Sequence, residues 1–221
     1  MRFDRIEKGI VAIFALCGVL IVSGYFYLDT RLARLVLDLI GTRFLFSSEI
    51  SKIPDILLSL VCSLTCISWS ARIYLARKPG GGSNLEFLEY IGSALPVAFV
   101  FETGLKDLFG RTNLRVWLLH PGPLGFHWFH GGGDFSGFPS GHMAVFTVLM
   151  IGIGRYFPRF RPLCAAMLLL LALALIITGY HFLSDIAAGV LVGLAVALLI
   201  RAAIPFLHRL ADRCPRRFET T

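Results

Sequence analysis

The apolar positions of this chain fall into six long runs that are separated by polar stretches. A helix needs about 20 mostly apolar residues to cross the hydrocarbon core of a bilayer. The runs that approach this length are residues 9–28, 53–76, 85–105, 139–157, 163–180 and 186–207. The third run contains Glu86, Glu89 and Glu102, and carboxylates within a membrane normally face the bundle interior or water. The pattern predicts an all-α bundle of six transmembrane helices, with both termini on one side of the membrane.

The segment between the first two runs, residues 29–52, has a different pattern. Leucine, valine and isoleucine recur at helical spacing between positions 32 and 40, with charged residues among them. Such a pattern predicts a short amphipathic helix that lies in the outer interface of the membrane. It is either a plain connector or a lid over a lipid substrate.

Composition agrees with a membrane protein and excludes an ordinary soluble domain. The chain is 56% hydrophobic and 16% charged, with a mean hydropathy of +0.74, whereas soluble domains are about 45–50% apolar and about 25% charged. A net charge of +7 on so apolar a chain is typical of loops beside anionic lipid. Membrane lipid is therefore the expected partner, and neither a nucleic acid nor a protein partner is indicated.

The distribution of Lys and Arg predicts the orientation. If the N-terminus is cytosolic, 14 of the 21 basic residues fall on the cytosolic side and seven fall outside. The expectation is a multi-pass protein of the cell (inner) membrane. Residues 106–137 would face the periplasm or exterior, and residues 78–84 the cytosol. With no internal repeat, residues 1–221 are predicted to form a single integral membrane domain.

A cluster of cations begins the longest polar loop. Lys106, Arg111 and Arg115 fall within ten residues at the end of the third predicted helix. Arg offers a two-donor fork to phosphate and Lys a point charge. The cluster is either a phosphate site or a basic patch at the lipid headgroups. Three histidines of the same loop have a spacing that is atypical of zinc sites, so no metal is expected.

Two further clusters begin the fourth and sixth predicted helices. Ser140 and Gly141 would leave backbone N–H groups at the positive end of a helix, where an anion can bind beneath His142. His181 and Asp185 are four residues apart and would share a helix face, so the carboxylate can hold one imidazole nitrogen. Six spans bring all three clusters to one membrane surface. Together they supply the groups for phosphoryl transfer through a phosphohistidine.

These motifs resemble those of the type-2 phosphatidic acid phosphatase family, which read K-x6-R-P, P-S-G-H and S-R-x5-H-x3-D. The resemblance covers residues 106–185, with P-S-G-H complete at residues 139–142. Two family arginines are missing. Asn113-Leu114 stands in place of Arg-Pro, and Leu175 stands in place of the arginine of the third motif.

The resemblance implies a role for each matching residue. His181 would attack phosphorus, Asp185 would orient it, and His142 would protonate the departing alkoxide and later activate water. No metal or cofactor is required in this scheme. The residues expected to bind the phosphoryl oxygens are Lys106, Arg111, Arg115, Ser140 and Gly141, of which the two arginines would compensate for those that are missing.

The implied protein is an integral membrane phosphatase that hydrolyses a lipid phosphate or pyrophosphate monoester at the non-cytosolic face. One alternative is a phosphotransferase that moves the group from one lipid to another. The other is a catalytically inactive relative that binds or moves anionic lipids. The presence of His142 and of the His181–Asp185 pair favours an enzyme, because a binding protein does not need a nucleophile held by a carboxylate.

Overall fold

A computed structural model describes residues 2–41, 53–77, 82–122 and 124–213 of the chain. The described residues form helices and loops, and no strand occurs among them. The predicted all-α class is therefore confirmed. Two predicted segments, residues 42–52 of the connector and 78–81 of the cytosolic turn, lie outside the described residues.

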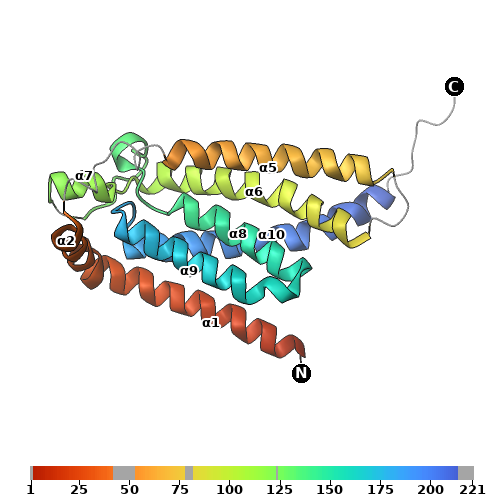
Figure 1. Cartoon of the computed structure of the whole chain (residues 1–221), viewed down its shortest axis with the longest axis horizontal. Helices are drawn as coiled ribbons and strands as arrows, with labels where there is room; N and C mark the ends of the chain where they lie inside the picture. Colours follow the sequence, from red (N-terminus) through yellow and green to blue (C-terminus); the bar gives the residue numbers. More distant parts are fainter. Residues whose placement is uncertain (1, 42–52, 78–81, 123, 214–221) are drawn as a thin grey trace.

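The principal helices run roughly along the long axis of the molecule, with two short ones across one end (Figure 1). They are α1 (Arg2–Ser23), α2 (Asp29–Ile40), α5 (Ile53–Leu75), α6 (Gly82–Phe109), α7 (Leu114–Leu119), α8 (Gly141–Tyr156), α9 (Arg161–Ile177) and α10 (Leu183–Arg213). The first residues of α1 and the last residues of α10 lie at one end, and α2 and α7 lie at the other. This is the arrangement expected for an even number of passes.

Five helical segments of the described chain are long and apolar enough to cross a membrane: Gly9–Ile40, Ile56–Leu75, Asn84–Phe109, Pro158–Ile177 and Leu183–Leu210. The remaining predicted span, the fourth (residues 139–157), corresponds to α8, whose 16 residues make it shorter than the other spans. It packs against α6, α9 and α10. A short helix is tolerated here because α8 is largely buried among its neighbours.

Small residues allow α8 and α10 to approach closely. A Cβ atom on Gly189 would lie 2.4 Å from the backbone oxygen of Ser140, and one on Gly193 would lie 2.5 Å from that of Ala144. Glycine is therefore required at both positions of α10 for this packing, as is common where membrane helices meet. The contact aligns the beginnings of α8 and α10 at the same end of the bundle.

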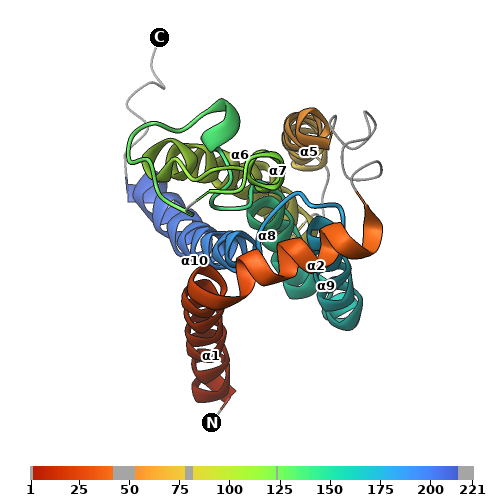
Figure 2. The same cartoon turned by 90° about the vertical axis from the view of Figure 1, so that its left-hand side faces the viewer.

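The chain changes direction between α1 and α2. A π-helical turn, Gly24–Leu28, joins them, and α2 crosses the end of the bundle beneath α7 (Figure 2). The predicted helix in this connector is thus confirmed for residues 29–40. Ala33 of α2 packs with Leu114, Trp117 and Phe182, so the crossing helix is fixed to the loops at this end.

Candidate active site

The three polar clusters converge on one cavity of about 570 Å³ at the end of the bundle where α6 stops and α8 and α10 start. Its polar lining consists of Glu102, Thr103, Lys106, Asp107, Asn113, Arg115, Ser136, His142, Tyr180 and His181. Four of the eight predicted site residues therefore share this space, namely Lys106, Arg115, His142 and His181. The other four, Arg111, Ser140, Gly141 and Asp185, are not part of its lining.

His181 is held by a backbone carbonyl. Its Nδ1 lies 3.1 Å from the oxygen of Gly137, and the residue is 7% exposed. Because a carbonyl oxygen only accepts, this contact assigns the proton to Nδ1. The Nε2 atom then carries a lone pair, which is the state that a nucleophilic imidazole requires.

Asp185 stands farther from His181 than the sequence predicts. The shortest separation, from Oδ2 to Nδ1, is 3.8 Å, which is too long for a hydrogen bond. The prediction assumed that both residues share a helix face, but α10 begins only at Leu183, so His181 precedes the helical register. Asp185 instead accepts a hydrogen bond from the backbone N–H of Phe182 at 2.9 Å and one from Arg111. Asp185 thus lies beside His181 without a hydrogen bond to its ring.

His142 and Tyr180 complete the aromatic wall of the cavity. The ring centroids of His142 and His181 are 6.2 Å apart, and Tyr180 lies 6.0 Å from the first ring and 6.1 Å from the second. The two imidazoles therefore face a common space. Sequence reasoning did not single out Tyr180, and its position next to His181 was the only available signal.

Two cations line the cavity among the described residues, Lys106 and Arg115. The guanidinium carbon of Arg115 lies 4.5 Å from the centre of the Tyr180 ring, a cation–π contact that directs it toward the histidines. Burial lowers the pKa of Arg115 below its ordinary value, and Tyr180 partly opposes this shift. Arg115 nevertheless stays charged, since arginine does not lose its proton in proteins.

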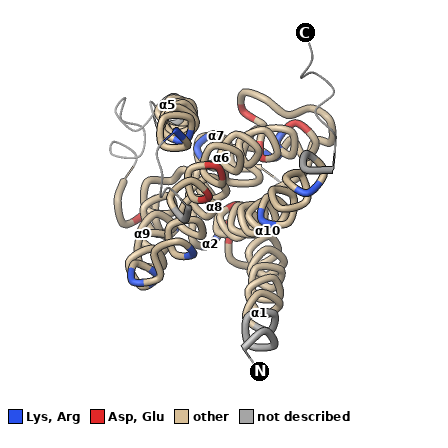
Figure 3. Tube along the Cα trace, turned by 90° about the vertical axis from the view of Figure 1, so that its right-hand side faces the viewer, with Lys and Arg blue, Asp and Glu red and all other residues tan. Residues whose placement is uncertain are grey.

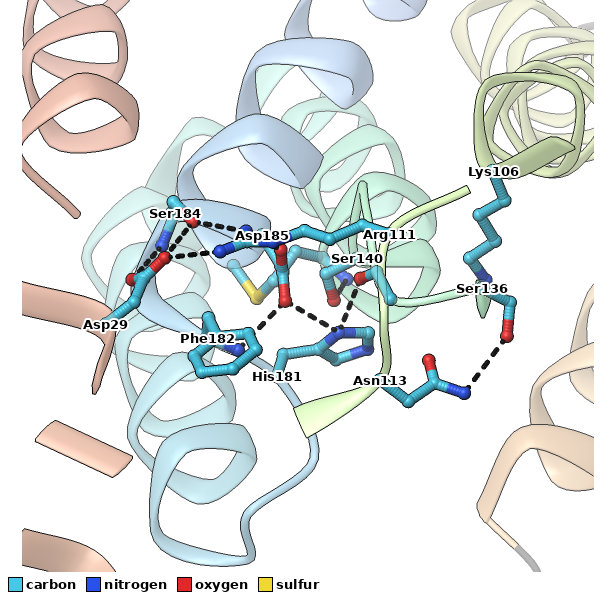
Figure 4. Close-up of polar contacts among 12 residues, drawn as sticks. Asp29, Lys106, Arg111, Asn113, Ser136, Ser140, His181, Phe182, Ser184 and Asp185 are labelled. Carbon is cyan, nitrogen blue, oxygen red and sulfur yellow. Dashed lines mark hydrogen bonds and ion pairs between the residues drawn. The ribbon is translucent and has the colours of Figure 1, made fainter. Parts of the chain in front are cut away.

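Arg111 points away from the cavity, contrary to its predicted role in binding phosphate. It is fully buried, and its guanidinium donates to Asp29 Oδ2 at 2.8 Å, to Ser184 Oγ at 2.6 Å and to Asp185 (Figure 4). Gly110, with φ of +55°, ends α6 just before it, so spacing counted from Lys106 no longer predicts where the side chain points. Burial opposes the charge of Arg111, but the two carboxylates outweigh it and raise the pKa of Arg111.

Ser140 and Gly141 also differ from expectation. Ser140 is completely buried, and its hydroxyl caps α8 by accepting from the N–H of Met143 at 3.4 Å. Its own N–H donates to the backbone oxygen of Asp185 at 3.0 Å. Beside Gly141 lies the carboxylate of Glu102, whose oxygens would both be 2.8 Å from a Cβ atom there. Ser140 thus contacts α10 and Gly141 contacts α6, and neither residue lines the cavity.

Glu102 was expected to face the bundle interior or water, but sequence reasoning gave it no role in the site. Its side chain is 2% exposed, and it forms an ion pair with Lys106 at 2.8 Å. The signal was present, because a carboxylate within a predicted membrane span normally faces an interior or aqueous site. Its exact place beside Gly141 depends on the packing of α6 against α8, which the sequence does not specify.

Asn113 and Leu175, which stand where the family motifs have arginines, lie in different surroundings. Asn113 lines the cavity, and its amide donates to the backbone oxygen of Gly133 at 2.9 Å and to Ser136 at 3.4 Å. Leu175 is buried with Met143 and Ile186 in an apolar cluster. The first position has thus kept a polar group at the cavity, and the second has become part of the core.

Two of the three histidines in the loop contact backbone oxygens outside the cavity. His127 Nδ1 lies 3.1 Å from the oxygen of Gly110, and His130 Nδ1 lies 2.8 Å from that of Trp128. Within the part of the chain that the structure describes, no group of three or more His, Cys, Asp or Glu residues is arranged to hold a metal.

Comparison with known proteins places these features in a family. The family model of the PAP2 superfamily matches residues 87–209. Two similar curated proteins are both named lipid A 1-phosphatase. That of Rhizobium johnstonii is 30% identical over 116 residues, which cover 51% of this chain and 48% of the relative. That of Rhizobium etli is 30% identical over 110 residues, which cover 48% and 47%.

The matched stretches thus span about half the length of the relatives. No solved structure matches the chain. The family match runs from α6 into α10, and it contains every lining residue of the cavity with a predicted catalytic or phosphate-binding role. Because the match covers more than half of its residues, the chain belongs to the PAP2 superfamily.

Proposed function

We propose that this protein is an integral membrane lipid phosphatase that works through a phosphohistidine on His181, with no metal. The observation that carries the proposal is the single cavity in which two histidines and two cations meet. Membership of the PAP2 superfamily and the two lipid A 1-phosphatase relatives support the same activity. Lipid A phosphorylated at its 1-position is therefore the first substrate to test.

The reaction proceeds in two displacements. His181 Nε2 attacks phosphorus and forms an N–P bond as the bond from phosphorus to the lipid oxygen breaks, and His142 gives its proton to that oxygen. Water then attacks the phosphohistidine, His142 takes a proton from the water, and the N–P bond breaks to release phosphate. Lys106 and Arg115 bind the phosphoryl oxygens, whose charge grows in each transition state. Both chemical steps use only side chains that line the cavity.

The decisive assay is release of inorganic phosphate by the purified protein in detergent, with a chelator present. A panel of lipid A 1-phosphate, phosphatidic acid, phosphatidylglycerol phosphate and undecaprenyl pyrophosphate covers the substrate classes. We expect release from at least one of them and no stimulation by divalent cations. Absence of release from the whole panel would refute the proposal.

We further propose that the cavity faces the periplasm or exterior of a cell (inner) membrane. Basic residues at the opposite end of the bundle support this orientation, including those on α5, α9 and α10 in Figure 3. A cysteine at Ser136, which lines the cavity, should react in intact cells with a maleimide that does not cross the membrane. A cysteine at Arg155, in the last turn of α8, should react only after the cells are opened. The reverse labelling pattern would contradict the orientation.

Arg115 is expected to supply charge that the two missing arginines provide elsewhere in the family. Arg115→Ala should lower kcat/KM by roughly 10²-fold, the usual effect of losing one preorganised donor to a developing anion. Arg34→Ala is the matched control, because Arg34 also lies over an aromatic ring, Trp117, but at an exposed position outside the cavity. A loss for Arg115→Ala as small as that of the control, or one that disappears at high salt, would show that Arg115 only touches headgroups.

A further inference from the structure

The cavity contains as many acidic as basic side chains, which is unexpected for a site that binds a phosphate. Lys106 and Arg115 are matched by Glu102 and Asp107. Asp107 is exposed, so solvent screens its charge. Glu102 is 2% exposed, whereas the Lys106 side chain is 22% exposed. A buried carboxylate beside a phosphate would repel it strongly, so its presence needs an explanation.

The surroundings of Glu102 provide one. Its carboxylate lies 2.8 Å from Lys106 Nζ on one side. On the other side it covers Gly141, the first residue of α8, so closely that a Cβ atom there would be 2.7 Å from its carboxyl carbon. A lysine and the N-terminal end of a helix are the two features that favour an anion. The carboxylate of Glu102 therefore lies between Lys106, which lines the cavity, and the beginning of α8.

From this arrangement we infer that Glu102 is an internal anion that holds the phosphate subsite until a more highly charged group displaces it. This inference rests on the proposed phosphatase function. On displacement, Lys106 exchanges the carboxylate for phosphoryl oxygens, and the Glu102 side chain rotates toward the open part of the cavity. No covalent bond changes in this exchange.

The consequence is selectivity between two kinds of lipid phosphate. Bulk anionic lipids such as phosphatidylglycerol carry a phosphodiester with one negative charge, while a terminal phosphate carries about −1.5 to −2 at pH 7. A cationic site exposed to the membrane would fill with the abundant phosphodiesters. The Glu102 carboxylate has the same charge as a phosphodiester and is already bound to Lys106, so a phosphodiester does not displace it. A terminal phosphate, with its higher negative charge, does. Glu102 is thus a specificity-determining residue.

The test measures the affinity for inorganic phosphate by calorimetry on the purified, full-length protein. The measurement is made in phosphatidylcholine micelles with and without phosphatidylglycerol. For the wild type we expect the same Kd in both micelles. For Glu102→Gln, which keeps the shape and removes the charge, we expect binding tighter by roughly tenfold in phosphatidylcholine. In that variant we also expect phosphatidylglycerol to weaken the binding.

Asp107→Asn is the matched control, because it removes a negative charge from the same cavity and the same helix and leaves the Glu102–Lys106 ion pair in place. It should bind phosphate like the wild type.

Glu102→Asp withdraws the carboxylate by one methylene. It should lower the Kd by less than Glu102→Gln does, and it provides a second measurement if Glu102→Gln does not fold. Weaker or unchanged phosphate binding in the variants would overturn the inference and leave Glu102 as a support for Lys106. Phosphate release from the lipid panel is a separate result, so failure of the proposed function is distinguishable from failure of this inference.

Discussion

Replacing His181 with alanine is expected to reduce phosphate release by roughly 10⁴-fold or more, because it removes the atom to which the phosphoryl group is transferred. The side chain is buried, and among the described residues its one hydrogen bond is to Gly137, so its loss should leave the fold intact. The measurement is single-turnover phosphate release from a substrate labelled in its phosphate, with an alkaline quench that preserves a phosphohistidine and a later acidification that releases its label. Wild-type protein should accumulate label and His181→Ala should not. Appreciable turnover by His181→Ala would contradict the phosphohistidine mechanism.

His142→Ala provides the matching comparison on the same cavity wall. Losing a general acid costs about 10²–10⁴-fold, and the loss depends on how poor the leaving group is. An aryl phosphate, whose leaving group needs no proton, should therefore recover much of the rate in His142→Ala and none in His181→Ala. Equal recovery in both variants would contradict the assigned roles.

Replacement of Arg111 is expected to have the largest effect on stability. Arg111→Met would leave Asp29 and Asp185 buried without their common partner, and breaking a buried ion pair in this way costs about 3–5 kcal/mol. Thermal unfolding in detergent measures the effect. Arg34→Met, an exposed arginine on α2, should change stability by no more than about 0.5 kcal/mol.

This variant also separates two roles for Arg111. If Arg111 binds the substrate, as the family motif implies, then Arg111→Met should fold normally and lose affinity for phosphate. If it supports the loop, then stability falls, and restoring charge balance with Asp29→Asn should recover part of it. A stable Arg111→Met protein with weak phosphate binding would contradict the structural role and restore the predicted one.

The predictable part of this protein is the part governed by periodicity and by helix ends. Apolar runs locate the membrane helices because a bilayer demands about 20 apolar residues from each. An even number of passes then brings Lys106, His142 and His181 to one end, as the structure has them. These conclusions depend only on the order of elements along the chain.

The direction of individual side chains was less predictable. The His181–Asp185 contact depended on a helical register that begins two residues later than His181. Arg111 follows a glycine with positive φ, and its partner Asp29 is 82 residues away, so no local pattern indicates that it faces inward. Glu102 could be predicted to face the interior, but its contact with Gly141 depends on how closely two helices approach.

The buried Asp29 is synthesised long before the residues that it contacts. It is made early, before every other residue of this site, and it meets Arg111 across 82 residues and Ser184 across 155. Until those residues enter the membrane, the carboxylate at the beginning of α2 has neither of these partners. The set of contacts that joins Asp29, Arg111 and Ser184 can therefore be complete only when the last helix has been made. A nascent chain that stops before α10 would carry every side chain that lines the cavity, His181 included, and would still lack Ser184 and Asp185, which hold Arg111.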